Sequence, residues 1–130
     1  MPNLSRFFIR SGMICLLLGL IAGAVATISP SMAAIRPTWI HLITVGWLTQ
    51  LIFGVALWMF PRPRTEPAKA GTLGWVGFWL LNAGLLLRIV GEPMRGFTAS
   101  GAAILPISAL LQLVAVASLL WALWPRVRAR

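Results

Sequence analysis

Charged residues divide the chain into four long apolar stretches. No charge occurs within residues 11–35, 37–61, 70–87 or 96–125, which are 25, 25, 18 and 30 residues long. A helix that crosses a bilayer needs roughly 20 apolar residues. A helix of a soluble protein would also carry polar residues at helical spacing, and these stretches have almost none. The pattern therefore predicts an all-α integral membrane protein, an antiparallel four-helix bundle.

Prolines and glycines indicate where these helices end. The second helix is expected to begin beside Pro37, because proline suits a first helical turn, and to end at Phe60, just before Pro61. The third is expected to stop at Gly91-Glu-Pro93 and the fourth at Pro125, with Pro106 either kinking the fourth or marking a later start. Together they form a single transmembrane domain over 1–130, with helices at about 7–29, 38–60, 73–90 and 102–124.

The first apolar stretch also has features of a signal peptide. Arg6 and Arg10 form a basic start, and Ser31-Met-Ala33 resembles a cleavage site with small residues. We interpret the stretch as a retained first helix.

Lysines and arginines in the short connections predict the orientation, since they favour the cytoplasmic side. With four spans, one side of the membrane carries eight of these residues and the other three. We therefore expect both termini in the cytoplasm, as in a multi-pass protein of the bacterial inner (cytoplasmic) membrane. Most of the net charge of +9 belongs to this topology signal, and it also suits the anionic headgroups of the lipid bilayer. It does not indicate nucleic-acid binding, because the arginines are scattered around hydrophobic spans. The three residues expected outside are Arg36, Arg88 and Arg95.

His41 is the only histidine, and it lies about one turn inside the second span. An ionisable side chain within a membrane is costly and should face protein, a cavity or a cofactor. Neutral imidazole is also the commonest side-chain metal ligand. At about 100° per residue, Gly46, Gln50 and Gly54 form one face of this helix, and their spacing favours close helix packing. His41 lies on the opposite face. The face shared with His41 is an apolar wall suited to a flat macrocycle: Thr44, Val45, Leu48, Ile52, Val55 and Met59.

Most catalytic sites are excluded by composition. The chain has no Asp, and its two acids, Glu66 and Glu92, are expected on opposite sides of the membrane. Carboxylate pairs and a Ser-His-Asp triad are therefore ruled out. Cys15 is the single cysteine and is interpreted as a small packing residue. Whether the chain is an enzyme is left open, and no complete catalytic site is present.

The segment Arg36-Pro-Thr-Trp-Ile-His41-Leu-Ile-Thr-Val-Gly46-Trp, followed by Phe53-Gly54-Val-Ala-Leu-Trp58-Met-Phe-Pro61, resembles helix II of the haem–copper oxidase superfamily, subunit I. The resemblance covers the first helices of that family, which includes nitric oxide reductases. It implies that His41, near the outer start of the helix, is an axial ligand of haem b. The family's copper-site histidines are missing, so this chain alone is not expected to reduce oxygen or nitric oxide.

A haem on His41 needs further groups from this chain or a second one. Met94 or Met32 is a candidate second ligand, as is a histidine of a second copy. In the resembled family, arginines near the outer surface bind haem propionates, which makes Arg36, Arg88 and Arg95 candidates. Arg88 is also spaced to pair with Glu92. A backbone carbonyl or Thr38 is the expected acceptor for the second imidazole nitrogen, and Asn82 is expected to hydrogen-bond between helices with Gln50.

Three functions remain open from the sequence. The chain is a small b-type haem protein for electron transfer or for gas or redox sensing, or a subunit that binds a pigment such as bacteriochlorophyll, or a cofactor-free structural subunit. We also expect a homo-oligomer or docking to other membrane subunits. Small-residue faces favour such contacts: Gly46, Gln50 and Gly54 on the second helix, and Gly12, Gly19 and Gly23 on the first.

Overall fold

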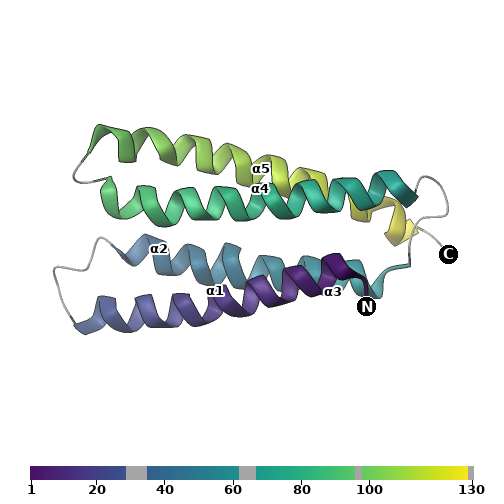
Figure 1. The fold of residues 1–130 in the computed structure, drawn as a ribbon, viewed down its shortest axis with the longest axis horizontal. Coiled ribbons are helices and arrows are strands. Elements are labelled where there is room, and N and C mark those ends of the chain that lie inside the picture. The colour runs from purple at the N-terminus through teal and green to yellow at the C-terminus, as the bar shows by residue number, and fades with distance from the viewer. Residues whose placement is uncertain (29–34, 62–66, 96–97, 129–130) are drawn as a thin grey trace.

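The chain folds into four long helical rods arranged antiparallel (Figure 1). The structure, a computed structural model, describes residues 1–28, 35–61, 67–95 and 98–128. Both termini lie at one end of the bundle, which we call the terminal end, and the opposite end is the far end. Each rod is long and apolar enough to cross a membrane. The rods are α1 (Asn3–Ile28), a continuous rod of α2 (Arg36–His41), η2 (Leu42–Thr49) and α3 (Gln50–Met59), then α4 (Pro67–Met94) and α5 (Ala99–Arg128).

The helix ends agree with the sequence at Pro37 and Pro61 but not at the other prolines. Pro37 lies in the first turn of α2, and Phe60 turns to an extended conformation (φ −80°, ψ 134°) before Pro61. The expectation that the third helix stops at Gly91-Glu-Pro93 is wrong, because α4 runs through Pro93 to Met94. α5 begins at Ala99 and continues through Pro106 and Pro125, so Pro106 does not mark a later start. A proline inside a helix removes one hydrogen bond and crowds the carbonyl four residues back, which membrane helices tolerate because neighbouring groups satisfy the freed backbone.

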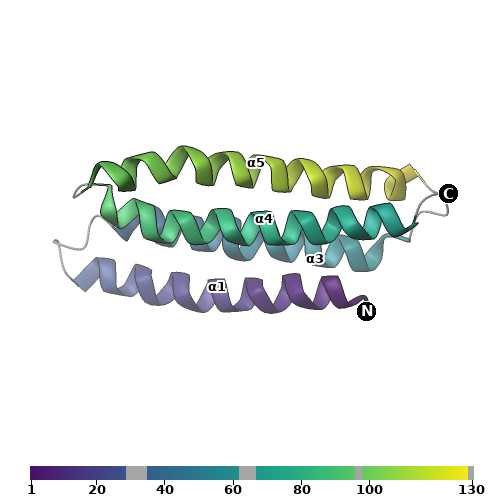
Figure 2. The ribbon, with the colours of Figure 1, turned by 45° about the horizontal axis from the view of Figure 1, so that its top comes forward.

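The rods pack as two helix pairs, which lie one above the other in Figure 1, and in Figure 2 α4 passes in front of α3. α1 lies along the second rod and α4 along α5, while α4 supplies most contacts between the pairs. A Cβ on Gly46 would lie 2.8 Å from Cys15 Cβ in α1, and one on Gly12 would lie 3.3 Å from the Trp47 carbonyl oxygen. The two glycine faces therefore meet each other within the chain. They do not provide the surface for self-association that the sequence suggested.

The buried core is concentrated towards the terminal end. Phe8 is fully buried and its ring lies 5.0 Å from that of Phe78, edge to face. Large apolar side chains on the outward faces, such as Leu17, Leu86 and Leu113, stay exposed. Such a surface is suited to lipid and not to water. The main core cluster comprises Leu4, Phe8, Phe53, Leu57, Phe78, Leu81, Ala115, Leu119 and Leu123.

The segment η2 is a π-helix that begins immediately after His41. In a π-helix each N–H bonds five residues back, so residues five apart lie above one another. His41 is five residues before Gly46, and a Cβ on Gly46 would lie 3.0 Å from Leu85 Cδ2 in α4. The wider turn therefore brings His41 round towards α4. The regular spacing of 100° per residue expected from the sequence fits α3 but not η2.

Candidate functional site at His41

His41 lies at the far end of the bundle, where α2 meets the last turns of α4. Its Nδ1 is 2.8 Å from Oε1 of Glu92 and 2.8 Å from the backbone carbonyl oxygen of Pro37. The carbonyl was one of the acceptors expected from the sequence. The carboxylate was not expected. Thr38, the other expected acceptor, is buried with its hydroxyl lacking a hydrogen-bond partner among the described residues.

The position of Glu92 follows from how the two helices run. α2 begins at the far end and α4 ends there, so their outer turns lie at the same depth. Gly46 faces Leu85, and from there His41 and Glu92 lie further towards the far end on facing sides. Because α4 stays helical through Pro93, the Glu92 side chain is held on this face.

Arg88 completes a group of three side chains that we call the far-end polar cluster: His41, Arg88 and Glu92. Its Nη1 lies 3.2 Å from Oε1 of Glu92, one turn along α4, as the i, i+4 spacing predicted. The Glu92 side chain is only 5% exposed, while those of His41 and Arg88 are 28% and 20% exposed. A carboxylate this buried is costly unless it is paired, and the arginine provides a permanent countercharge.

Two polar atoms of the cluster retain hydrogen-bonding capacity. Oε2 of Glu92 and Nε of Arg88 are buried and have no partner among the described residues. Buried polar groups in membrane proteins are normally satisfied by protein, water or a ligand. A further polar group could therefore donate a hydrogen bond to Oε2 of Glu92 or accept one from Nε of Arg88.

The imidazole orientation is suited to binding one metal atom. A metal-ligating histidine almost always donates its second ring N–H to a carboxylate or a carbonyl, which fixes the tautomer and raises the basicity of the ligand. Nδ1 of His41 has both kinds of acceptor, which leaves Nε2 for the metal. The described part of the chain contains no group of three or more His, Cys, Asp or Glu side chains that could enclose an ion. A metal bound here would have one ligand from the described part of this chain, Nε2 of His41.

The other residues expected at a haem are distributed unevenly. Arg88 lies in the cluster, but its charge is offset by Glu92. Arg36 and Arg95 are exposed at the far end. Met94 is two residues beyond Glu92, about 200° around the helix, so it lies on the side of α4 away from His41. Met32 lies outside the described residues.

The apolar wall expected on the face of His41 lies on the outside of the bundle, whereas Nδ1 of His41 is turned towards Glu92 in α4, so the regular face predicted from the sequence is not kept at His41. Leu48, Ile52 and Met59 are 46%, 57% and 70% exposed, and Thr44 is also exposed. Val45 differs, since it packs against the core. A flat macrocycle on this wall would therefore lie between this chain and lipid or a second chain, and not inside the four-helix bundle.

A second polar network lies in the middle of the spans and joins three rods. Asn82 of α4 accepts hydrogen bonds from Ser11 (2.9 Å) and Gln50 (3.1 Å), and donates to the carbonyl oxygen of Phe78 (2.8 Å). Gln50 is fully buried. The predicted contact between Asn82 and Gln50 is confirmed. Ser11 was missed, although it lies one residue before Gly12 on the predicted packing helix.

No family model, curated protein or solved structure matches this chain. Any functional statement therefore rests on the residues and their geometry.

Proposed function

We propose that this chain is a small multi-pass protein of the bacterial inner membrane that binds a b-type haem through Nε2 of His41. The observation that carries the proposal is the carboxylate of Glu92 on Nδ1, 2.8 Å away. That hydrogen bond would hold the ring in the tautomer whose Nε2 lone pair is available to iron. The resemblance of residues 36–61 to a haem-ligating helix supports the same residue.

Each residue of the far-end polar cluster would have a separate role. Haem supplies one-electron exchange or the binding of a small gas. His41 would hold the iron, and Glu92 would orient the ring. Arg88 would supply the countercharge to the Glu92 carboxylate. Arg36 and Arg95, which have more exposed positions, are the better candidates for the propionates.

The number of side chains that hold the haem would separate electron transfer from gas sensing. Of the two methionines expected as second ligands, Met94 lies away from His41 and Met32 lies outside the described residues. A haem held by His41 alone could also bind a small gas. A second copy packed against the exposed wall would instead supply its own histidine, and two axial histidines suit electron transfer. In that second case the homo-oligomer would form at this wall and not at the glycine faces.

The optical spectrum of the purified protein tests the assignment. Wild type from haem-replete cells, in mild detergent, should show a Soret band that sharpens on reduction. His41→Ala should lose this band while inserting normally in the membrane. Thr49→Ala is the matched control, because Thr49 lies on the same rod but outside the apolar wall, and its hydroxyl bonds to the Thr44 carbonyl of its own helix. A wild-type protein without haem, or a His41→Ala protein with an unchanged spectrum, overturns the proposal. Far-red absorbance would indicate bacteriochlorophyll instead.

The second candidate is a cofactor-free structural subunit. The observation that favours it is that the contact between His41 and Glu92 joins the two helix pairs. In that case His41→Ala would lower the stability of the bundle, and wild type would show no pigment at any wavelength. Crosslinking in native membranes would then identify the neighbouring subunit.

A further inference from the structure

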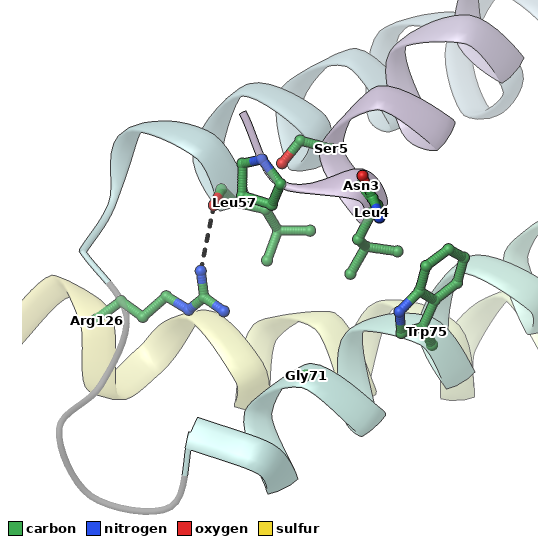
Figure 3. A pocket seen from close by; sticks show the side chains of 8 residues that line it. Asn3, Leu4, Ser5, Leu57, Gly71, Trp75 and Arg126 are labelled. Carbon is green, nitrogen blue, oxygen red and sulfur yellow. Dashed lines mark hydrogen bonds between the residues drawn. The ribbon is translucent and has the colours of Figure 1, made fainter.

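A pocket of about 260 Å³ opens at the terminal end, far from His41 (Figure 3). Its walls come from the first residues of α1, the last turn of α3, the start of α4 and the end of α5. Four rods thus converge on one space. The side chains that matter for its chemistry are those of Ser5, Trp75 and Arg126.

The first turn of α1 supplies backbone donors to this pocket. The N–H of Arg6 bonds to the carbonyl oxygen of Pro2, which makes it the first intrahelical bond in α1. The N–H groups of residues 3–5 precede it and therefore have no acceptor within the helix. Residues 2–5 all line the pocket. Together with the positive end of the helix dipole, these N–H groups favour an anion.

Two buried side chains add to this donor set. Ser5 is fully buried, lines the pocket, and its hydroxyl has no hydrogen-bond partner among the described residues. Arg126 is 7% exposed and donates from Nη1 to the carbonyl oxygen of Leu57 at 3.3 Å, which caps the last turn of α3. Its guanidinium group therefore lies in the pocket wall. In Figure 3 the indole nitrogen of Trp75 is turned towards the same space.

We propose that this pocket binds a phosphate group. The donors are of the kind that phosphate oxygens prefer: a guanidinium, a hydroxyl and helix N-terminal amides. The same chemistry is offered by the headgroup of an anionic phospholipid and by free inorganic phosphate. The position at the end of the membrane spans, with Leu4 and Leu57 in the walls, favours the lipid. This site is independent of the haem proposed at His41.

Gly71 provides a way to close the pocket without removing a donor. It lines the space, and a Cβ built on it meets nothing within 4 Å. Gly71→Leu should therefore fill the pocket while every other wall residue stays in place. Arg126→Gln removes the buried charge. Arg10→Gln is the matched control, because it also removes one positive charge, and Arg10 is exposed on α1 and does not line the pocket.

Native mass spectrometry of the delipidated protein tests the site. The probes are phosphatidylglycerol, a galactosyl diacylglycerol that lacks phosphate, and inorganic phosphate. We expect phosphatidylglycerol to bind about tenfold more tightly than the glycolipid, with that preference lost in Gly71→Leu and Arg126→Gln and kept in Arg10→Gln. A phosphate adduct with the same dependence, and no lipid preference, would identify free phosphate as the ligand.

Equal binding of the two lipids with no phosphate adduct overturns the proposal. So does a preference that survives Gly71→Leu in a protein whose circular dichroism and elution volume match wild type. Since Gly71→Leu leaves Arg126 in place, a folding defect in Arg126→Gln does not prevent the test.

Discussion

Replacing Asn82 by leucine should destabilise the bundle more than its position on α4 alone would suggest. The substitution keeps the branched shape and the number of heavy atoms of the side chain, with a larger volume, and removes an amide that contacts three rods. Asn82 accepts from Ser11 and Gln50 at 2.9 and 3.1 Å. Without it, the amide of Gln50, which is fully buried, loses its partner in α4 and keeps only a 3.9 Å contact with Cys15 Sγ.

Two known effects set the magnitude of this loss. A buried polar group left unpaired costs about 1–3 kcal/mol. Interhelical hydrogen bonds in membrane proteins are worth less, on average about 0.6 and at most about 1.7 kcal/mol, because the unfolded chain in the membrane also finds partners. Gln50 is fully buried and two donors lose their acceptor at once, so we expect about 1–2 kcal/mol.

A double-mutant cycle separates this network from packing. If both amides are replaced, in Asn82→Leu/Gln50→Leu, no amide is left unpaired and the loss should be smaller than the sum of the single losses. The assay is reversible unfolding in mixed micelles, followed by the fluorescence of the seven tryptophans. Ser118→Ala is the control, because its hydroxyl bonds only to Val114 of its own helix. Strictly additive losses would refute the interpretation of Asn82 as a link between helices.

Three further outcomes follow from the contacts. Gly46→Ala should lower the free energy of unfolding by about 1–3 kcal/mol, since its Cβ would lie 2.8 Å from Cys15 Cβ. Gly71→Ala should leave this free energy unchanged or raise it by up to about 1 kcal/mol, because its Cβ meets nothing within 4 Å. Equal stabilities of the two variants in the same unfolding assay would contradict this. Glu92→Ala should lower the free energy of unfolding by about 1–3 kcal/mol whether or not haem is present, because it removes the carboxylate that pairs with Arg88. An unchanged unfolding midpoint would show that the far-end polar cluster does not stabilise the bundle. Tags on both termini should be labelled only from the cytoplasmic side, and periplasmic labelling of either in cells with an intact inner membrane would refute the proposed orientation.

The helical class of the fold could be predicted because membrane spans obey few rules. Four uncharged stretches gave four helices, and the face of Gly46, Gln50 and Gly54 is buried as predicted. The partner of that face was less predictable. Small residues show that a close contact exists, but they do not show which helix makes it. Here Gly12 meets the second rod within one chain, so the contact carries no information on oligomers.

The basic residues predict the membrane orientation as a group, but their count does not predict where each side chain lies. As a set they predict the orientation through their number alone. Arg126 entered that count as an ordinary residue of the tail, yet it is buried against the carbonyl oxygen of Leu57. The reason is that α5 continues past Pro125, which carries Arg126 back between the helices. A helix stopped at that proline would have left Arg126 in the tail.

The link between His41 and Glu92 shows why the candidate site was only half predictable. An acceptor for the imidazole was sought along the sequence, where Pro37 and Thr38 are near and no carboxylate is. The antiparallel order already placed the start of the second helix and the end of the third at the same depth. Two local features then brought the side chains together: the π-helical turn that rotates His41, and the continuation of α4 through Pro93 that fixes Glu92. Neither departs visibly from an ordinary apolar span in sequence. In a bundle of this kind, ionisable residues should therefore be paired by their depth along antiparallel spans before their distance along the chain is considered.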